Sequence, residues 1–538
     1  MKKAILFLFL APLFASAQIL GTQTNSLNFG SVNVGDKDSL QLTITNTGNQ
    51  SVNVTNIKFY VIYGDYPFSA SQNSFSLAAG ASQNVWIYFE PEHNIMHNSE
   101  LVIQHNATSG VTSVDLQGQG VFPMSYYSST QNLEEQALKN ALKTLLAQGY
   151  NQRSYSQARD FMYATIDNVN GQVECVYTGR TATFSTRSGA NNNSFNCEHT
   201  FPQGFFNQNL PMRSDIHHLF PTDVNSNSQR GNLPFGIVSG SGTWSQGGSK
   251  KGGGLFEPRN VQKGRTARAM MYFVIRYQDY SSHFSVQEAI LRNWHNTYSP
   301  GAFEIQRNNN VFNVQNNRNP FIDYPQLEER ITNFVSNSVK TPFNGLDILQ
   351  TSLNFGNFDA SQPETYTYVM VNRGNQVINF SNFSISNSQY LSFASGSGNN
   401  QALNPGEAIM ISVIANTQGA ATQLNETLDF NTSLPGPQSS FSIPISGNAI
   451  ITSLKEQHLA NRIEVYPNPF QDYISIRTDN LELSEMRLVD ALGKIVIQKS
   501  FNTTSQDLRT LDLSSVSKGT YFLQLISDEG VLNQRIVK

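Results

Sequence analysis

The chain has 538 residues, and this length predicts several domains. Aromatic residues make up 11% of it, which excludes a disordered chain, and its two cysteines exclude a disulfide-dense scaffold and any zinc cluster that needs four thiolates. The net charge of −4 argues against a protein that coats nucleic acid, but only as an average over the whole chain.

The N-terminus has the pattern of an export signal. Lys2 and Lys3 precede an apolar run over 4–14, and Ala15-Ser16-Ala17 follows as a cleavage site. We therefore predict a signal peptide over 1–17. The apolar run is too short for a permanent membrane span, and no later stretch is apolar enough, so we expect an exported protein with no stable membrane insertion.

A repeat separates the next parts of the chain. The pentapeptide SLNFG starts at Ser26 and again at Ser352, and the pattern NxGNQ starts at Asn46 and again at Asn372. Both pairs have an offset of 326 residues, which predicts two copies of one domain, at 18–122 and 346–449. Alternating apolar residues between Gly- and Asn-rich turns predict β-sandwiches. The pattern resembles immunoglobulin-like domains attached to exported bacterial proteins, where they serve as spacers.

The C-terminal segment carries motifs of its own. After an expected linker at 450–464, residues 465–538 contain YPNPF from Tyr466, DALGK from Asp490 and GTYFL from Gly519. Short strand patterns predict a small β-domain. These motifs resemble the sorting domain of the type IX secretion system. The resemblance implies type IX secretion machinery as a partner and a secreted or surface-attached protein.

Charge distinguishes the segment between the two repeats. Residues 18–122 carry a net charge of −5 and residues 346–538 carry −6, whereas residues 123–345 carry +5. A basic domain suits a polyanionic substrate, although a solvated basic face would give the same count. Helical spacing at 133–146 and 267–275, with short strands between them, predicts an α+β domain.

Candidate catalytic residues lie between 196 and 236 of this basic segment. CEHTFPQ starts at Cys197, SDIHHLFPTD at Ser214 and NSQRGNLPFG at Asn227. Together they offer an imidazole base, oxygen ligands for a hard cation, and Arg. Hydrolysis of a phosphodiester needs these residue types, because water must be deprotonated and developing charge neutralised.

These motifs resemble the endonuclease I family, whose members carry the His-Me finger, or ββα-metal, motif. The resemblance implies that His199 is the general base and that Glu198 and Asn227 are metal ligands. It implies Mg²⁺ as the cofactor, with Ca²⁺ or Mn²⁺ as alternatives, and products with a 5′-phosphate. It also makes Arg268 the expected phosphate contact. DNA is the expected substrate, with RNA left open.

Other residues of the segment are assigned supporting roles. Asp215, His217, His218 and Arg230 are expected around the ligands and the base; Asp215 is one candidate for orienting His199, which the sequence leaves open. The second group of candidates is the cysteine pair. Cys175 and Cys197 lie 22 residues apart in an exported domain, and we expect a disulfide between them over two buried thiols.

The predicted architecture is an α+β His-Me finger nuclease domain between two all-β immunoglobulin-like sandwiches, with a small C-terminal all-β sorting domain. The main alternative is an extracellular adhesin or matrix-binding protein with a vestigial nuclease domain. A second alternative is a zinc enzyme that uses His199, His217 and His218, but no HExxH pattern supports it.

Overall fold

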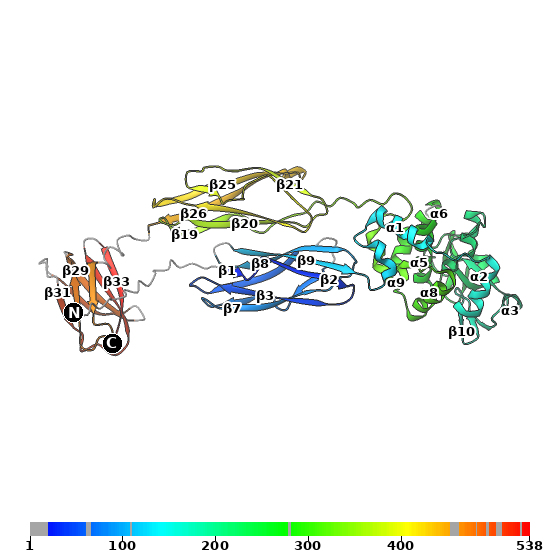
Figure 1. The fold of residues 1–538 in the computed structure, drawn as a ribbon, viewed down its shortest axis with the longest axis horizontal. Coiled ribbons are helices and arrows are strands. Elements are labelled where there is room, and N and C mark those ends of the chain that lie inside the picture. The colour runs from blue at the N-terminus through cyan, green and yellow to red at the C-terminus, as the bar shows by residue number, and fades with distance from the viewer. Residues whose placement is uncertain are drawn as a thin grey trace, which may run out of the picture.

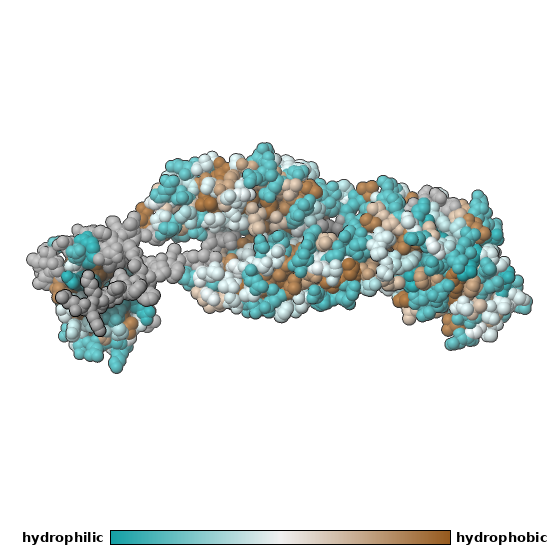
Figure 2. Space-filling view, in the orientation of Figure 1, coloured by the Kyte–Doolittle hydropathy of each residue, from teal (hydrophilic) through white to brown (hydrophobic). Residues whose placement is uncertain are grey.

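A computed structural model describes residues 20–60, 66–107, 110–277, 281–451, 462–479, 481–490, 494–501, 508–527 and 530–538. The predicted signal peptide and most of the predicted linker lie outside these ranges. Within them, no helix is both long enough and apolar enough to cross a bilayer. Hydrophilic residues cover much of the face shown in Figure 2, with apolar residues scattered among them.

The first domain is a two-sheet β-sandwich. Its strands are β1 (Leu20–Thr22), β2 (Ser26–Asn33), β3 (Asp38–Asn46), β4 (Val52–Tyr60), β5 (Phe68–Ala70), β6 (Phe75–Leu77), β7 (Ser82–Phe89), β8 (Met96–His105) and β9 (Val111–Val121). One sheet has the order β1-β3-β7-β5 and the other β2-β9-β8-β4-β6. Alternating apolar residues of the two sheets fill the core between them.

The third domain in the chain has the same strand order. Its strands are β18 (Leu346–Ile348), β19 (Leu353–Asp359), β20 (Glu364–Asn372), β21 (Ile378–Ile385), β22 (Leu391–Phe393), β23 (Gln401–Leu403), β24 (Ala408–Ala415), β25 (Thr422–Thr432) and β26 (Ser440–Ile450). The sheets are β18-β20-β24-β22 and β19-β26-β25-β21-β23. In both domains the strand that carries SLNFG pairs in parallel with the last strand.

The repeated residues perform the same backbone tasks in both copies. Gly30 and Gly356 have φ of 65° and 62° at a break in the register of their strands, a conformation that glycine adopts without steric cost. The side chain of Asn46 donates to the backbone carbonyls of Gln50, Leu77 and Ala78, and that of Asn372 donates to the carbonyls of Gln376 and Leu403. The repeat in the sequence therefore marks turns and bulges that the sandwich requires.

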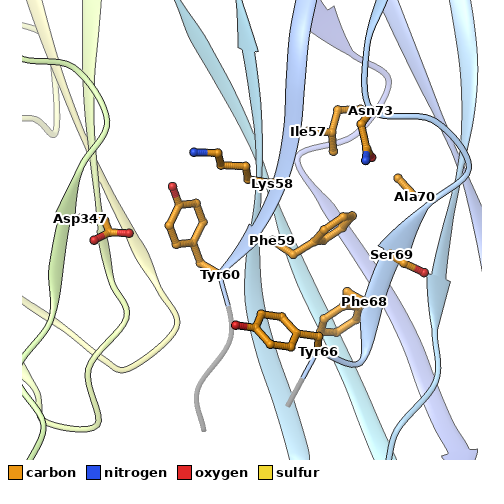
Figure 3. A pocket seen from close by; sticks show the side chains of 10 residues that line it. All are labelled: Ile57, Lys58, Phe59, Tyr60, Tyr66, Phe68, Ser69, Ala70, Asn73 and Asp347. Atoms are coloured by element: carbon orange, nitrogen blue, oxygen red, sulfur yellow. The ribbon is translucent and has the colours of Figure 1, made fainter. Parts of the chain in front are cut away.

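The two sandwiches lie side by side, and both connections to the nuclease domain leave from the same end of the pair (Figure 1). Tyr60, Val102 and Val111 of the first pack against Val369 and Val371 of the second. Beside this contact is a cavity of about 450 Å³, into which Lys58 and Tyr60 point from β4 toward Asp347 of β18 (Figure 3). Burial, with the nearby Asp347 carboxylate, raises the pKa of Tyr60 to about 12.

The central domain is mixed. Its helices are α1 (Glu135–Ala147), α2 (Tyr155–Phe161), α3 (Arg187–Asn192), α4 (Val224–Arg230), α5 (Asn260–Tyr277), α6 (Ser281–Ser285), α7 (Glu288–Thr297), α8 (Ala302–Gln315) and α9 (Pro320–Asp323). Its strands are β10 (Asn168–Val169), β11 (Gln172–Glu174), β12 (Thr181–Thr183), β13 (Phe195–His199), β14 (Leu219–Asp223), β15 (Trp244–Gln246), β16 (Ser249–Gly252) and β17 (Leu255–Glu257). The buried helix α5 runs through the core, and the two predicted helices are α1 and part of α5.

One boundary differs from the sequence expectation. Phe122, which the repeat assigns to the first sandwich, packs in the core of the nuclease domain and stacks on Tyr324 with ring centroids 3.6 Å apart. Burial of a large aromatic ring is favourable, and the nuclease core offers Phe122 an apolar site. The repeat pattern could not predict this contact, because it contains no information about the neighbouring domain.

The C-terminal domain is a small two-sheet β-structure. Its strands are β27 (Ile463–Tyr466), β28 (Tyr473–Thr478), β29 (Leu483–Asp490), β30 (Ile495–Ser500), β31 (Leu508–Asp512), β32 (Thr520–Ser527) and β33 (Gly530–Val537). The sheets have the orders β27-β28-β31 and β30-β29-β32-β33. The predicted fold class, with two sandwiches, a mixed nuclease domain and this β-domain, is confirmed.

Candidate active site

A ββα unit holds the predicted catalytic residues. β13 and β14 pair antiparallel, from Phe195 opposite Asp223 to His199 opposite Leu219, and α4 follows β14 directly. Glu198 and His199 end β13, and Asn227 lies on α4. Because neighbouring side chains leave a strand on opposite faces, Glu198 and His199 have separate surroundings.

His199 is held by a backbone carbonyl. Its Nε2 lies 3.1 Å from the carbonyl oxygen of Arg213, and since a carbonyl only accepts, Nε2 carries the proton and Nδ1 the free lone pair. The ring packs near Tyr155, Phe206 and His218, with centroids 5.4, 6.4 and 5.5 Å away. Burial, followed by the His218 charge, lowers the pKa of His199 to about 3, so the ring is a neutral base.

Glu198 lies on the other face of β13, and Arg230 supports it. Glu198 Oε1 accepts a hydrogen bond of 2.7 Å from the hydroxyl of Tyr177 and lies 3.2 Å from Arg230 Nε. Arg230 is buried and also donates to the carbonyl of Thr200 at 2.6 Å. Burial raises the pKa of Glu198, against the charge of Arg230. A cation bound beside this buried carboxylate, in addition to Arg230, would stabilise its ionised form.

Asn227 faces β13 with its oxygen unused. Its Nδ2 donates to Asn196 Oδ1 at 2.9 Å and to the Cys197 carbonyl at 3.2 Å. In the part of the chain that the structure describes, neither Asn227 Oδ1 nor Glu198 Oε2 accepts a hydrogen bond. Asn227 and Arg230 are three residues apart on one face of α4, which brings Asn227 to the side where Glu198 lies. Two unpartnered oxygens of this chemistry fit a hard divalent cation.

Asp215, His217 and His218 are buried, and the hydrogen bonds of their side chains go to residues other than Glu198 and Asn227. Asp215 does not orient His199; its carboxylate accepts from Tyr272 and from Gln315 at 2.8 and 3.0 Å. Burial opposes its ionisation, but the charge of Arg276 dominates and holds the pKa of Asp215 well below its usual value.

The two histidines bond separate carbonyls and do not form a metal cluster. His217 Nε2 contacts the carbonyl of Asn317 at 3.1 Å, and His218 Nε2 that of Met212 at 2.7 Å. Burial lowers the pKa of both rings to about 4, opposed by Asp215. No three His, Cys, Asp or Glu among the described residues form a metal-binding group, so the zinc alternative gains no support.

The structure contradicts the predicted role of Arg268. Its guanidinium is 1% exposed and all three nitrogens are occupied. Nε and Nη2 donate to the two carboxylate oxygens of Glu304 at 2.7 and 2.6 Å, and Nη1 donates to the Tyr298 carbonyl at 2.8 Å. A buried and fully paired arginine stabilises the packing of α5 on α8 and cannot reach a phosphate.

The expected disulfide is also wrong in this structure, because Cys175 and Cys197 are free, buried thiols. Cys175 Sγ contacts Thr222 Oγ1 at 3.5 Å, whereas Cys197 Sγ donates to the Glu198 carbonyl at 3.6 Å. Burial raises the pKa of Cys197 to about 12, so this thiol is unreactive.

Two arginines beside His199 are functional candidates that the motifs did not reveal. Arg159 and Arg213 stack on the ring of Tyr155, with guanidinium carbons 4.3 and 4.6 Å from its centroid. The Nε atom of each is buried without a hydrogen-bond partner among the described residues. Neither forms an ion pair there, so both charges are available near the base.

Comparisons with known proteins match three parts of the chain to described families. Residues 134–326 match the family described as Endonuclease I. Residues 464–538 match the secretion system C-terminal sorting domain, and residues 19–119 match the HYDIN/CFA65/VesB-like, Ig-like domain.

The relatives of this chain include extracellular ribonucleases and an extracellular deoxyribonuclease. An extracellular ribonuclease of Bacillus amyloliquefaciens is 30% identical over 228 residues, which cover 38% of this chain and 78% of the relative. An extracellular ribonuclease of Bacillus subtilis (strain 168) is 28% identical over 228 residues, with the same shares. An extracellular deoxyribonuclease of Aeromonas hydrophila is 32% identical over 125 residues, which cover 22% of this chain and 52% of the relative.

Proposed function

Because the chain belongs to the endonuclease I family and is a secreted or surface-attached nuclease, we propose that it hydrolyses phosphodiester bonds with His199 as the general base. The observation that carries the proposal is the geometry of His199. Its Nε2 is fixed on the Arg213 carbonyl, which leaves Nδ1 of a buried, neutral ring to accept a proton.

In the proposed reaction, Nδ1 of His199 takes a proton from water as the water oxygen attacks phosphorus. The bond from phosphorus to the 3′ oxygen breaks, and the leaving oxygen takes up a proton from solvent to become a 3′-hydroxyl, so the other new end carries a 5′-phosphate. A divalent cation, proposed as Mg²⁺ with Ca²⁺ or Mn²⁺ as alternatives, supplies neutralisation of the charge that develops on the phosphate and the leaving oxygen. Glu198 and Asn227 would hold it, and Arg230 and Tyr177 keep the Glu198 carboxylate in place.

We assign the phosphate contact to Arg213, with Arg159 beside it. Both guanidinium groups lie against Tyr155, next to His199, and neither has a carboxylate partner among the described residues. A charged donor near a nonbridging oxygen stabilises the transition state more than the bound substrate. DNA is the proposed substrate and RNA is included, since backbone phosphate is the group that these residues recognise.

Digestion of supercoiled plasmid and of a structured RNA tests this function. We expect both to be cut, with ends that polynucleotide kinase labels only after treatment with phosphatase, because the 5′ end already carries phosphate. Ends that accept label directly would show a 5′-hydroxyl and contradict the proposed bond breakage. The absence of any cleavage, with metal present, would contradict the function itself.

The C-terminal domain is expected to act in transport and not in catalysis. Deletion of 465–538 should retain the protein in the periplasm of its host, because these residues match a secretion sorting domain. The truncated protein should cleave plasmid at a rate within about twofold of the full chain. Fractionation and immunoblotting measure the first result and a plasmid assay the second. Normal extracellular appearance of the truncated protein would refute the sorting role.

A further inference from the structure

A second cavity in the nuclease domain has its own lining. It has a volume of about 450 Å³ and lies between the β10–β11 hairpin, the first turns of α5 and the start of α8. We call it the α5–α8 cavity; Gln262, Arg265 and Phe303 are among the residues that line it. Its lining includes neither His199 nor the three rings that pack around His199, and its size suits a small organic ligand.

The cavity wall contains one cation without an anionic partner. Asp167 is paired with Arg307, with contacts of 2.7 and 3.0 Å, and Glu174 is paired with Arg259. Arg265 forms no hydrogen bond or ion pair with the described residues, and its guanidinium lies 4.7 Å from the ring centroid of Phe303. Burial lowers the pKa of Arg265, although nearby carboxylates oppose this. A partly desolvated, unpaired guanidinium favours an anion such as a phosphate.

A buried amide in the same wall also lacks a partner. Gln262 is 1% exposed, and its Oε1 accepts no hydrogen bond in the part of the chain that the structure describes. An unsatisfied buried acceptor costs folding free energy unless a ligand supplies a donor. Gln262 and Arg265 are three residues apart on α5, so both side chains reach the cavity from one face of the helix.

The cavity rim is apolar and aromatic. Phe303 is 36% exposed, and Val169 and Val261 are exposed beside it. Nucleobases stack on aromatic rings and on guanidinium planes, and their N–H groups donate to amide oxygens. A nucleotide supplies every group that the cavity lacks, namely an anion, a planar ring and a hydrogen-bond donor.

We infer that the α5–α8 cavity binds one nucleotide unit, with the phosphate on Arg265, the base against Phe303 and a base N–H on Gln262 Oε1. This inference rests on the proposed function, since a nuclease meets such units both in a strand and as products. The cavity wall adjoins the catalytic site, because Glu174 and Val176 precede Tyr177, which donates to Glu198.

Binding to the full-length His199→Ala protein in EDTA tests the inference, because these conditions prevent cleavage. The probes are a fluorescein-labelled single-stranded DNA of ten nucleotides and unlabelled AMP as competitor, measured by fluorescence anisotropy. We expect Arg265→Gln to weaken oligonucleotide binding about tenfold, which is the scale of one charge-assisted hydrogen bond. Phe303→Ala should weaken binding by a similar factor.

Two further variants separate binding from charge and folding. Lys143→Gln removes the same charge from the exposed surface of α1 and should change affinity less than twofold. Gln262→Leu removes the unsatisfied acceptor, so it should keep or raise the melting temperature while weakening oligonucleotide binding. A purely structural Gln262 would change stability without changing affinity.

The two sources of the nucleotide give different results. If AMP displaces the oligonucleotide, and Arg265→Gln abolishes that competition, the cavity takes a free mononucleotide. If AMP does not compete while Arg265→Gln weakens oligonucleotide binding, the cavity takes a nucleotide within a strand. Unchanged binding of both probes by folded Arg265→Gln and Phe303→Ala would overturn the inference. Plasmid cleavage by the parent protein reports separately on the proposed function.

Discussion

His199→Ala is expected to cut supercoiled plasmid at least about a hundredfold more slowly than the parent protein at saturating Mg²⁺, the usual scale of general-base catalysis. The reason is that the His199 ring keeps a free Nδ1 while its Nε2 is bonded to Arg213. Glu198 cannot replace it, since the carboxylate lies on the opposite face of β13 with Tyr177 and Arg230. Single-turnover cleavage measures the rate, and a gel-shift assay in EDTA should show retained binding.

The matched control is His295→Ala. His295 is a buried histidine of the same domain whose Nε2 bonds the Pro325 carbonyl at 3.0 Å, as His199 bonds that of Arg213. Its loss should lower the melting temperature but leave the specific activity of the folded protein unchanged. Added imidazole should restore part of the His199→Ala rate. Cleavage by His199→Ala near the parent rate would refute the mechanism and leave His218, 5.5 Å away, as the next base to test.

Removal of divalent metal is expected to abolish cleavage, and Mg²⁺ or Mn²⁺ should restore it. Asn227→Ala should raise the metal concentration for half-maximal rate by at least about tenfold, because it removes one of two protein oxygens available to the ion. Part of its lost rate should return at high Mg²⁺, whereas His199→Ala should gain nothing. A weakened ligand changes affinity, but a missing base does not.

Asn225→Ala provides the comparison for this experiment, since Asn225 lies exposed on the same helix, two residues before Asn227. Asn225→Ala should cleave plasmid at the same rate as the parent protein at every metal concentration. Full cleavage in excess chelator, by protein whose metal content is shown to be zero, would remove Glu198 and Asn227 from their assigned role.

Sequence motifs can identify candidate site residues only where the candidates are side chains that occur in a fixed order along the chain. Glu198, His199 and Asn227 could be proposed from the sequence because their side chains stand in the order of the family's motifs, and the structure places them on β13 and α4 of a ββα unit. The group that holds His199 could not be predicted in this way. It is the main-chain carbonyl of Arg213, and every residue has such an atom, so no residue type marks it.

Arg268 shows the opposite limit. A motif can identify an arginine, but the fold decides which anion it meets. Glu304 lies 36 residues later, and packing of α8 on α5 brings its carboxylate to one edge of the guanidinium, where it accepts from Nε and Nη2. The same limit applies to the cysteines. Their separation of 22 residues does not predict that Cys175 and Cys197 contact different groups in the fold.

The parallel arrangement of the two sandwiches determines how tension would pass through the chain. Because the nuclease domain is joined to both sandwiches at one end of the pair, a molecule held by its C-terminal end carries load through the second sandwich only. The first sandwich lies outside this covalent path and contacts the second along its side through Tyr60, Val102 and Val111. In such a molecule the side-by-side pair separates the nuclease domain from the held end by a single sandwich length, about 35 Å for the 11-residue strand β9, rather than by two.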